Sequence, residues 1–218
     1  MSSSHSVSCA VVKLIWITPN ADQIIGDLAR VSSPNNQGKD PAPLIQYMME
    51  HRHWSPFEMA SACFEIETTR AIAHQILRHR SFSFQEFSQR YARAKFADTV
   101  KARIESPVNR QSSIQTTDAD LIREWEFAQW RVIELAWKEY SAALKMGIAR
   151  EVARAILPEG LTQTRLYMSG TIRSWLHYLD LRTAHDTQEE HRKIALDIAE
   201  ILSQEIPITM RAYQLAEY

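Results

Sequence analysis

Two segments in the first third of the chain have the residue patterns of β-strands. Residues 11–18 are rich in β-branched and aromatic residues and stop before Pro19, and residues 60–69 alternate with a period of two. In the second segment, one side carries Phe64, Ile66 and Thr68 and the other carries Cys63, Glu65 and Glu67. The residue content of the first segment and the alternation of the second predict two β-strands, the second with one buried face, and a shorter strand is expected at residues 162–168.

Other segments repeat their apolar residues every three to four positions, which predicts helices. The expected helices cover residues 20–30, 43–51, 70–80, 121–145, 149–156, 171–181 and 187–202. Asn20 is expected to cap the first helix, and Pro158 marks the end of the fifth. The residues of the long helix that are expected to pack mostly in the core are Trp125, Trp130, Leu135 and Trp137.

The order of these elements indicates the fold class. Residues 32–41 are expected to form a surface loop, 81–91 to be irregular or extended, and 101–120 to be polar and turn-prone. Strands and helices are mixed without a βαβ repeat or a glycine-rich phosphate loop, and the chain has only 5 glycines. We therefore expect an α+β fold, with residues 1–218 forming a single domain and residues 1–9 flexible.

Composition restricts the class of protein further. The chain is 45% hydrophobic and 23% charged, which excludes a disordered or membrane-embedded protein. Its 25 basic and 26 acidic residues give a net charge of -1, so no overall positive field attracts nucleic acid or anionic lipid. Cys9 and Cys63 form no paired motif and no basic signal region is present, which predicts a cytoplasmic protein without a disulfide framework.

Positive charge is nevertheless concentrated in residues 70–95. Six basic residues stand there against Glu86 alone, a local charge of +5: Arg70, Arg78, Arg80, Arg90, Arg93 and Lys95. Guanidinium groups match phosphate oxygens in bidentate geometry, so this segment suggests an anion-binding site. A solvated basic surface is the alternative interpretation.

Polar residues of this segment are spaced so that they share faces. On one side of a predicted helix lie Gln75, Arg78 and His79. On one side of a predicted extended strand lie Glu86, Ser88 and Arg90. Aromatic residues are interleaved with them: Phe82, Phe84, Phe87 and Tyr91. Flat apolar surface beside cations suits a planar heterocycle with a phosphate tail, and it suits single-stranded RNA equally.

The same segment contains a spaced motif. Arg78-His-Arg80 is followed after seven residues by Ser88 and, two positions later, by Arg90. This arrangement resembles the signature of the flavin-dependent thymidylate synthases, the ThyX family. Blocks similar to the family's other conserved segments occur in the usual order at residues 29–32, 53–58, 154–158 and 169–182. The resemblance extends from Val11 to about Leu202.

The resemblance implies both a fold and a reaction. The family has a mixed domain with a central, mainly antiparallel sheet and long flanking helices, assembled as a homotetramer whose active sites are shared between subunits. Its members convert dUMP to dTMP with 5,10-methylenetetrahydrofolate as one-carbon donor, FAD as hydride carrier and NADPH as reductant. The expected partners are therefore dUMP, a folate and further copies of the chain, with neither nucleic acid nor membrane.

Matching positions imply which residues contact each ligand. Those expected to bind dUMP are Gln75, Arg78, Glu86, Ser88, Gln89, Arg90, Arg154 and Arg182. Those expected to surround FAD are Ser32, His53, Ser55, Glu58, Arg78, His79, Arg80, Ser83, Gln85, Glu86, Thr171, Arg173 and His177. By the same resemblance, Arg182 is the expected catalytic residue.

Methylation at C5 of uracil requires negative charge to develop on the ring, and attack by cysteine is one route to it. Cys9 precedes the first predicted strand and Cys63 lies inside an apolar one, so neither is expected to be a nucleophile. A guanidinium such as that of Arg182 can stabilise the charge instead, although an arginine at a helix C-terminus also stabilises the helix dipole. Arg173 and Arg182 are nine residues apart, so they point to opposite sides of an ideal helix, which suits a subunit junction.

Two further possibilities are weighed against this one. Two pairs of histidines lie on different predicted elements, and no Cys or carboxylate completes a standard metal-binding spacing, so no metal site is expected: His51, His53 and His74, His79. A non-catalytic nucleotide- or RNA-binding module would use residues 70–95 without any chemistry. Flavin absorption distinguishes the enzyme from such a module, because only the enzyme needs a coloured cofactor.

Overall fold

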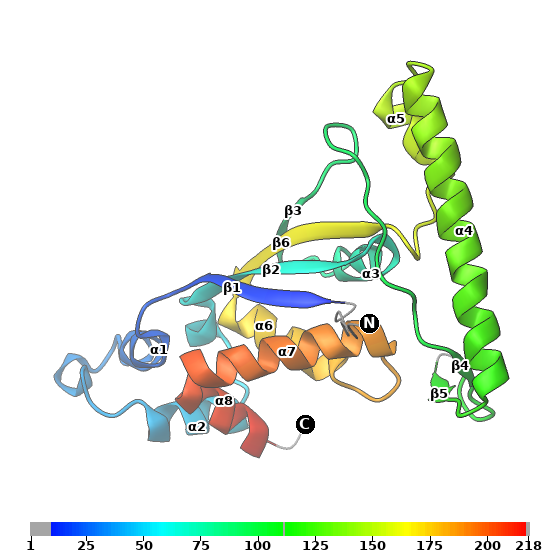
Figure 1. Ribbon diagram of the computed structural model, residues 1–218. Coiled ribbons are helices and arrows are strands. Elements are labelled where there is room, and N and C mark those ends of the chain that lie inside the picture. The colour runs from blue at the N-terminus through cyan, green and yellow to red at the C-terminus, as the bar shows by residue number, and fades with distance from the viewer. Residues whose placement is uncertain (1–9, 111, 217–218) are drawn as a thin grey trace, which may run out of the picture.

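A four-stranded antiparallel sheet lies at the centre of the computed structural model, which describes residues 10–110 and 112–216 (Figure 1). Its strands, in spatial order, are β1 (Val11–Ile17), β2 (Ser61–Thr69), β6 (Gln163–Thr171) and β3 (Ser83–Glu86). Each neighbouring pair is antiparallel. The expected α+β class with a central antiparallel sheet is confirmed. Cys9 and the flexibility expected for residues 1–9 lie outside the described residues.

The strand β2 carries the predicted buried face. Phe64, Ile66 and Thr68 are buried, as the alternation of the sequence predicts. Cys63 departs from the pattern because it is also buried, with 7% of its surface exposed. Burial raises the pKa of the Cys63 thiol, which favours its protonated, less nucleophilic form.

Helices cover one face of the sheet and bury its apolar side (Figure 1). They are α1 (Ala21–Ala29), α2 (Ala42–Glu50), α6 (Ile172–Arg182), α7 (Glu189–Glu205) and α8 (Pro207–Leu215). Two 3-10 turns lie in the connections, η1 (Pro34–Asn36) between α1 and α2 and η2 (Ser55–Glu58) between α2 and β2. The fully buried core contains Trp175, Phe57 and Phe64, and burial of each such side chain stabilises the fold by about 1.5–3 kcal/mol.

The helix α8 is absent from the sequence prediction, which ends its last helix at residue 202. The chain turns at Ile206, and Pro207 starts a new helix in the first-turn position that proline tolerates. The carboxylate of Asp22 in α1 accepts hydrogen bonds from the backbone N–H groups of Ile208 and Thr209 at 2.9 and 3.0 Å. Asp22 thereby caps α8 from another helix, a contact that no local pattern reveals.

The helices after β2 and β6 start where the sequence predicts, but the predicted cap of the helix after β1 is not found. Thr69 ends β2 and caps α3 (Arg70–Ile76), and Thr171 ends β6 and caps α6 in the same way. The prediction that Asn20 caps α1 is wrong, because Asn20 lies in the left-handed region at φ 52° and its side chain makes no capping hydrogen bond. Thus β2 and β6 each continue directly into a helix, at opposite ends of the sheet.

The basic segment is less regular than predicted. α3 ends at Ile76 rather than near residue 80, so Gln75, Arg78 and His79 do not share one face of a helix. β3 ends at Glu86, and the following residues turn, with the N–H of Tyr91 donating to the carbonyl of Ser88. The predicted alternation through residue 90 is therefore wrong as well.

The helix α4 (Ala119–Lys145) stands beside the sheet and its helix layer (Figure 1). At one end lies a hairpin of β4 (Arg103–Glu105) and β5 (Ser113–Gln115), which the sequence prediction misses. At the other end the predicted helix 149–156 divides into α5 (Arg150–Ala153) and the 3-10 turn η3 (Arg154–Ile156).

Large apolar residues of α4 are exposed in this chain, so the expectation that they pack in its core is wrong. Their exposed fractions are 44% for Trp125, 51% for Trp130, 60% for Leu135 and 44% for Trp137. Only a narrow stripe of the helix is buried: Gln129, Ile133, Ala136 and Tyr140. An apolar surface of this kind on a soluble helix usually marks an interface.

Candidate functional site

The helix α6 carries the two arginines on which the predicted site depends. Arg173 in its first turn forms an ion pair with Glu58 of η2. Arg182 in its last turn donates a hydrogen bond from Nε to Nε2 of His79 at 2.9 Å. The two arginines therefore contact different parts of the molecule, as their spacing predicts.

Several residues expected near FAD gather around the first half of α6. His177 contacts the ring of Trp54 edge-on, with ring centroids 4.6 Å apart, just before the turn that carries Ser55 and Glu58. Both His177 and Trp54 line a cavity of about 300 Å³ that also includes Asp180. Burial, followed by the charge of Arg173, lowers the pKa of His177.

The turn at residues 77–82 is fixed in place by Phe82. The ring of Phe82 packs against Trp175 with centroids 4.6 Å apart, and against Gly170 of β6. A Cβ atom at residue 170 would lie only 2.5 Å from the Phe82 ring, so this close approach requires glycine. The anchored turn directs His79 toward α6 and leaves Arg78 and Arg80 exposed.

Polar side chains form a buried cluster where α3, α6 and α7 meet. His191 of α7 is fully buried and lies 3.1 Å from both Oε1 of Gln75 and the hydroxyl of Tyr178. Burial and, to a smaller extent, the charge of Arg182 lower the pKa of His79 to about 4. The same two causes, followed by His79, lower the pKa of His191 to about 3. Both imidazoles are therefore neutral at neutral pH and available to accept hydrogen bonds.

The free energy of unfolding should fall with acidification because of His191. Its pKa in the fold, about 3, lies below the usual 6.5, so its contribution is full above pH 6.5 and is lost as the pH falls toward 3. Chemical denaturation at several pH values between 6 and 4 gives the dependence of the free energy of unfolding on pH. For His191→Asn this dependence should be weaker than for the wild type by up to about 1.4 kcal/mol per pH unit. Ile198→Val, a non-titrating change on the same helix, should keep the wild-type slope. Equal slopes for the wild type and His191→Asn would contradict the assignment.

The end of β3 and the loop after it hold the rest of the motif. Glu86 accepts a hydrogen bond from Thr164 at 2.8 Å and pairs with Arg70 at 3.4 Å. Ser88 accepts a hydrogen bond from the backbone N–H of Arg90 at 3.3 Å. Gln89 is buried, with 4% of its surface exposed, and its Nε2 has no partner among the described residues.

The loop brings two of the expected dUMP ligands to one place. The Arg90 side chain lies 3.3 Å from the carboxylate of Glu151 in α5, and Nε of Arg154 donates to the carbonyl of the same residue at 3.3 Å. The side chains of Arg90 and Glu151 are 58% and 54% exposed, and such ion pairs stabilise a protein by only about 0–1 kcal/mol. A bound phosphate can therefore replace Glu151 as the partner of Arg90 at little cost.

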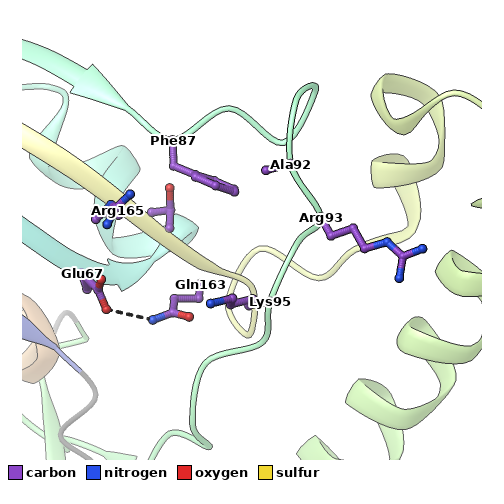
Figure 2. A pocket seen from close by; sticks show the side chains of 8 residues that line it. Glu67, Phe87, Ala92, Arg93, Lys95, Gln163 and Arg165 are labelled. Carbon is purple, nitrogen blue, oxygen red and sulfur yellow. Dashed lines mark hydrogen bonds between the residues drawn. The ribbon is translucent and has the colours of Figure 1, made fainter.

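A cavity of about 230 Å³ adjoins this loop (Figure 2). It lies between β2, β6 and the segment after β3, where Phe87 and Ala92 face Gln163 and Glu67. Three cationic residues and one carboxylate line it: Arg93, Lys95, Arg165 and Glu67. The predicted positive character of the segment is thus concentrated beside the motif loop.

The predicted residues fall into three groups rather than one. One surrounds Arg173, the second surrounds Arg182, and the third follows β3. Ser32 lies in the exposed turn after α1, and Ser83 and Gln85 lie exposed on β3. His53 is exposed just before η2, and Thr171 caps α6.

Three functional candidates escape the sequence analysis. Arg70 is counted there as a charge, yet its position beside Glu86 becomes clear only in the structure. Tyr178 and His191 occupy apolar helix faces and give no signal of the cluster that they form. Within residues 10–110 and 112–216, no group of three or more His, Cys, Asp or Glu side chains could hold a metal ion, and no helix is long and apolar enough to cross a membrane.

The fold and its matches define the class of protein. A family model described as "Thymidylate synthase complementing protein" matches residues 13–208. Among solved structures, the chain is similar to the UMP/dUMP methylase PolB from Streptomyces cacaoi bound with 5-Br dUMP. That similarity has a TM-score of 0.84 and 30% sequence identity, and it covers 95% of each chain.

Curated relatives specify the family. A flavin-dependent thymidylate synthase from Synechocystis is 46% identical over 191 residues, which cover 88% of each chain. A protein of Paramecium bursaria Chlorella virus 1 named "Probable flavin-dependent thymidylate synthase" is 45% identical over 195 residues, 88% of this chain and 90% of its own. The chain belongs to the flavin-dependent thymidylate synthase family.

Proposed function

We propose that the chain methylates dUMP to dTMP in the cytoplasm as a single synthase domain, with 5,10-methylenetetrahydrofolate as one-carbon donor and NADPH as reductant of bound FAD. The observation that carries the proposal is the motif in its structural setting. The turn 78–80 is anchored beside Arg182, and the loop 88–90 lies beside Arg154. The family of the chain and the bromo-dUMP bound by its structural neighbour support the same reaction.

The residues present fit a flavin dinucleotide. Nε of Arg173 is a buried donor without a partner among the described residues, which suits an acceptor atom of a bound group. Arg78 and Arg80 are exposed cations suited to the pyrophosphate. Those expected to hold FAD are Ser32, His53, Ser55, Glu58, Arg78, His79, Arg80, Ser83, Gln85, Glu86, Thr171, Arg173 and His177. When bound, FAD supplies the hydride that completes the methyl group.

The protein's own part in the reaction is to bind and polarise the nucleotide. Ser88, Arg90 and Arg154 would hold the phosphate, because Arg90 and Arg154 both contact Glu151 and Ser88 contacts the backbone N–H of Arg90. Arg182 would stand at the pyrimidine edge, held by its hydrogen bond to neutral His79. A fixed guanidinium stabilises negative charge as it develops on the ring, so no cysteine nucleophile is needed. Gln75, Arg78, Glu86 and Gln89 complete the proposed dUMP contacts.

Replacement of Arg90 with alanine should weaken dUMP binding about tenfold, because one charge-assisted contact to the phosphate is lost. Isothermal titration with dUMP measures the change, and flavin content should stay at the wild-type level. Arg110→Ala, a change of another exposed arginine outside the basic segment, is the matched control. Equal affinities for the wild type and Arg90→Ala would exclude Arg90 from the phosphate site.

A direct assay tests the proposed function. Purified protein should be yellow with oxidised-flavin absorption, and anaerobic incubation of the reduced protein with dUMP and the folate should yield dTMP. A colourless protein that forms no dTMP and binds RNA with steep salt dependence would instead be a nucleic-acid-binding module.

The exposed face of α4 supports the homotetramer with shared sites that we propose as the active form. Its large apolar residues stay 44–60% exposed among the described residues, and association with further copies would bury them. The neighbouring turn η3 carries Arg154, so an interface along α4 and α5 would lie next to a proposed dUMP ligand.

A further inference from the structure

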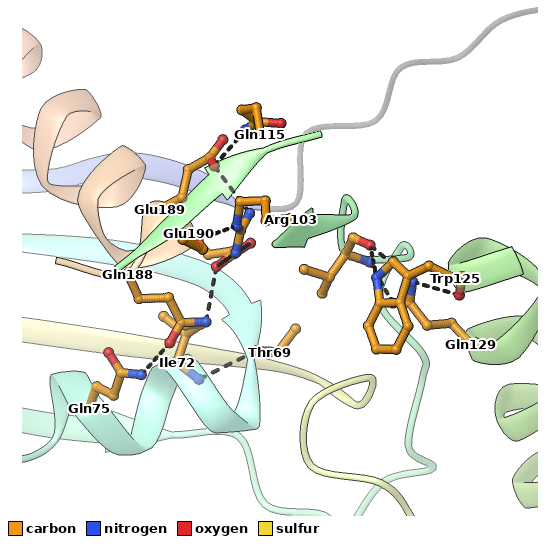
Figure 3. A network of polar contacts seen from close by, with 12 residues as sticks. Thr69, Ile72, Gln75, Arg103, Gln115, Trp125, Gln129, Gln188, Glu189 and Glu190 are labelled. Atoms are coloured by element: carbon orange, nitrogen blue, oxygen red, sulfur yellow. Dashed lines mark hydrogen bonds and ion pairs between the residues drawn. The ribbon is translucent and has the colours of Figure 1, made fainter. Parts of the chain in front are cut away.

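A chain of hydrogen bonds leads from Gln75 of α3 through the start of α7 to the β4–β5 hairpin (Figure 3). Nε2 of Gln75 donates to Oε1 of Gln188 at 2.7 Å, and Nε2 of Gln188 donates to the carboxylate of Glu190 at 3.0 Å. Glu190 is paired with Arg103 of the hairpin at 2.7 Å. On its other side, Gln75 is connected to α6 through His191 and Tyr178.

The carboxylate of Glu190 at one end determines which group donates and which accepts in every hydrogen bond of this series. The ionised carboxylate of Glu190 can only accept, so Gln188 must offer it the amide nitrogen and offer its oxygen to Gln75. Gln75 then gives its nitrogen to Gln188 and its oxygen to His191, whose Nδ1 must carry the proton. Nε2 of His191 is left as an acceptor for the hydroxyl of Tyr178, 3.1 Å away.

Reversing the Gln75 amide would break this order. A flipped amide would place its oxygen against the oxygen of Gln188, and its nitrogen against the protonated Nδ1 of His191. His191 is fully buried, so no water can relieve the second conflict. Gln75 is only half-buried, so its second N–H and its second lone pair are available to a ligand in one fixed orientation.

We infer that His191 is a positioning residue, which holds the Gln75 amide in the single orientation that dUMP meets. The inference rests on the proposed function, in which Gln75 contacts dUMP. His191 itself does not touch the nucleotide. It acts through Gln75, and the Glu190–Arg103 pair sets the direction of the bonds from the far end.

The charged and titratable groups around His191 favour its role as a neutral group. Arg182 and His79, which are hydrogen-bonded to each other, both oppose a positive charge on His191. The hydroxyl of Tyr178, on α6, donates its hydrogen bond to Nε2 of His191, which must therefore be unprotonated. Positioning of Gln75 should therefore persist across neutral pH.

A double-mutant cycle tests the inference in the flavin-loaded protein with dUMP as the probe. His191→Leu should raise the dUMP dissociation constant about fivefold, and Gln75→Ala/His191→Leu should bind no more weakly than Gln75→Ala alone. His191→Asn should recover most of the affinity, because its amide N–H can replace Nδ1–H. Ile194→Ala, a buried change one turn away, controls for general loss of stability and should leave the dissociation constant unchanged.

A second variant keeps the test decisive if His191→Leu fails to fold. Gln188 is exposed, and Gln188→Ala should weaken dUMP binding about threefold, again without effect in the Gln75→Ala background. Unchanged affinity, or losses that add to that of Gln75→Ala, would overturn the inference while leaving the proposed function intact. A wild-type protein that binds no dUMP would overturn both.

Discussion

Arg182→Ala should reduce dTMP formation about 10²–10³-fold while the protein keeps its flavin. The guanidinium is held by its hydrogen bond to His79, whose low pKa keeps Nε2 available as an acceptor. Without the arginine, no fixed positive charge stands at that position to stabilise charge on the pyrimidine. Arg173, the partner of Glu58, is on the opposite side of α6 and cannot replace it.

The measurement is single-turnover formation of dTMP, with flavin absorption recorded on the same sample. Arg211→Ala on α8, an exposed arginine far along the chain from the motif, should leave the rate unchanged. Arg182→Lys should also be slow, because lysine cannot reproduce both the Nε hydrogen bond and the planar guanidinium. A near-normal rate for Arg182→Ala would remove Arg182 from the chemistry.

Trp130→Glu should dissociate the proposed tetramer and lower activity by about 10²-fold or more, because the proposed shared site loses its geometry when the subunits separate. Trp130 is 51% exposed on α4, and a charge there would oppose burial against another copy. Analytical ultracentrifugation measures the mass, and the dTMP assay measures the activity.

Lys138→Glu, which changes a residue of the same helix that is already charged, provides the control and should preserve assembly. A Trp130→Glu protein that sediments as a monomer with full activity would exclude shared sites. A wild-type protein that is itself a fully active monomer would exclude them equally.

Prediction from sequence succeeds where local patterns determine the structure. The two-residue period of β2 and the predicted starts of α3 and α6, each within one residue, are found in the fold. It fails where contacts distant in sequence decide the outcome. α8 depends on capping by Asp22, and the early end of α3 depends on the packing of Phe82 against Gly170 and Trp175.

The same distinction applies to the candidate site. The motif identifies Arg78 to Arg90, and its spacing is visible in the sequence alone. His191 is more than 100 positions further along, on a helix whose pattern is that of an ordinary packed helix. Its hydrogen bond to Gln75 exists only because α7 docks against α3, and no spacing rule reaches across that separation.

Gly170 has no side chain, yet the position of the arginine-rich turn depends on it, because the Phe82 ring of that turn packs directly against its backbone. A larger residue at 170 would displace the ring and, with it, the backbone that presents Arg78 and Arg80. A screen for inactive mutants would therefore score this position as essential, although it offers no chemical group to any ligand.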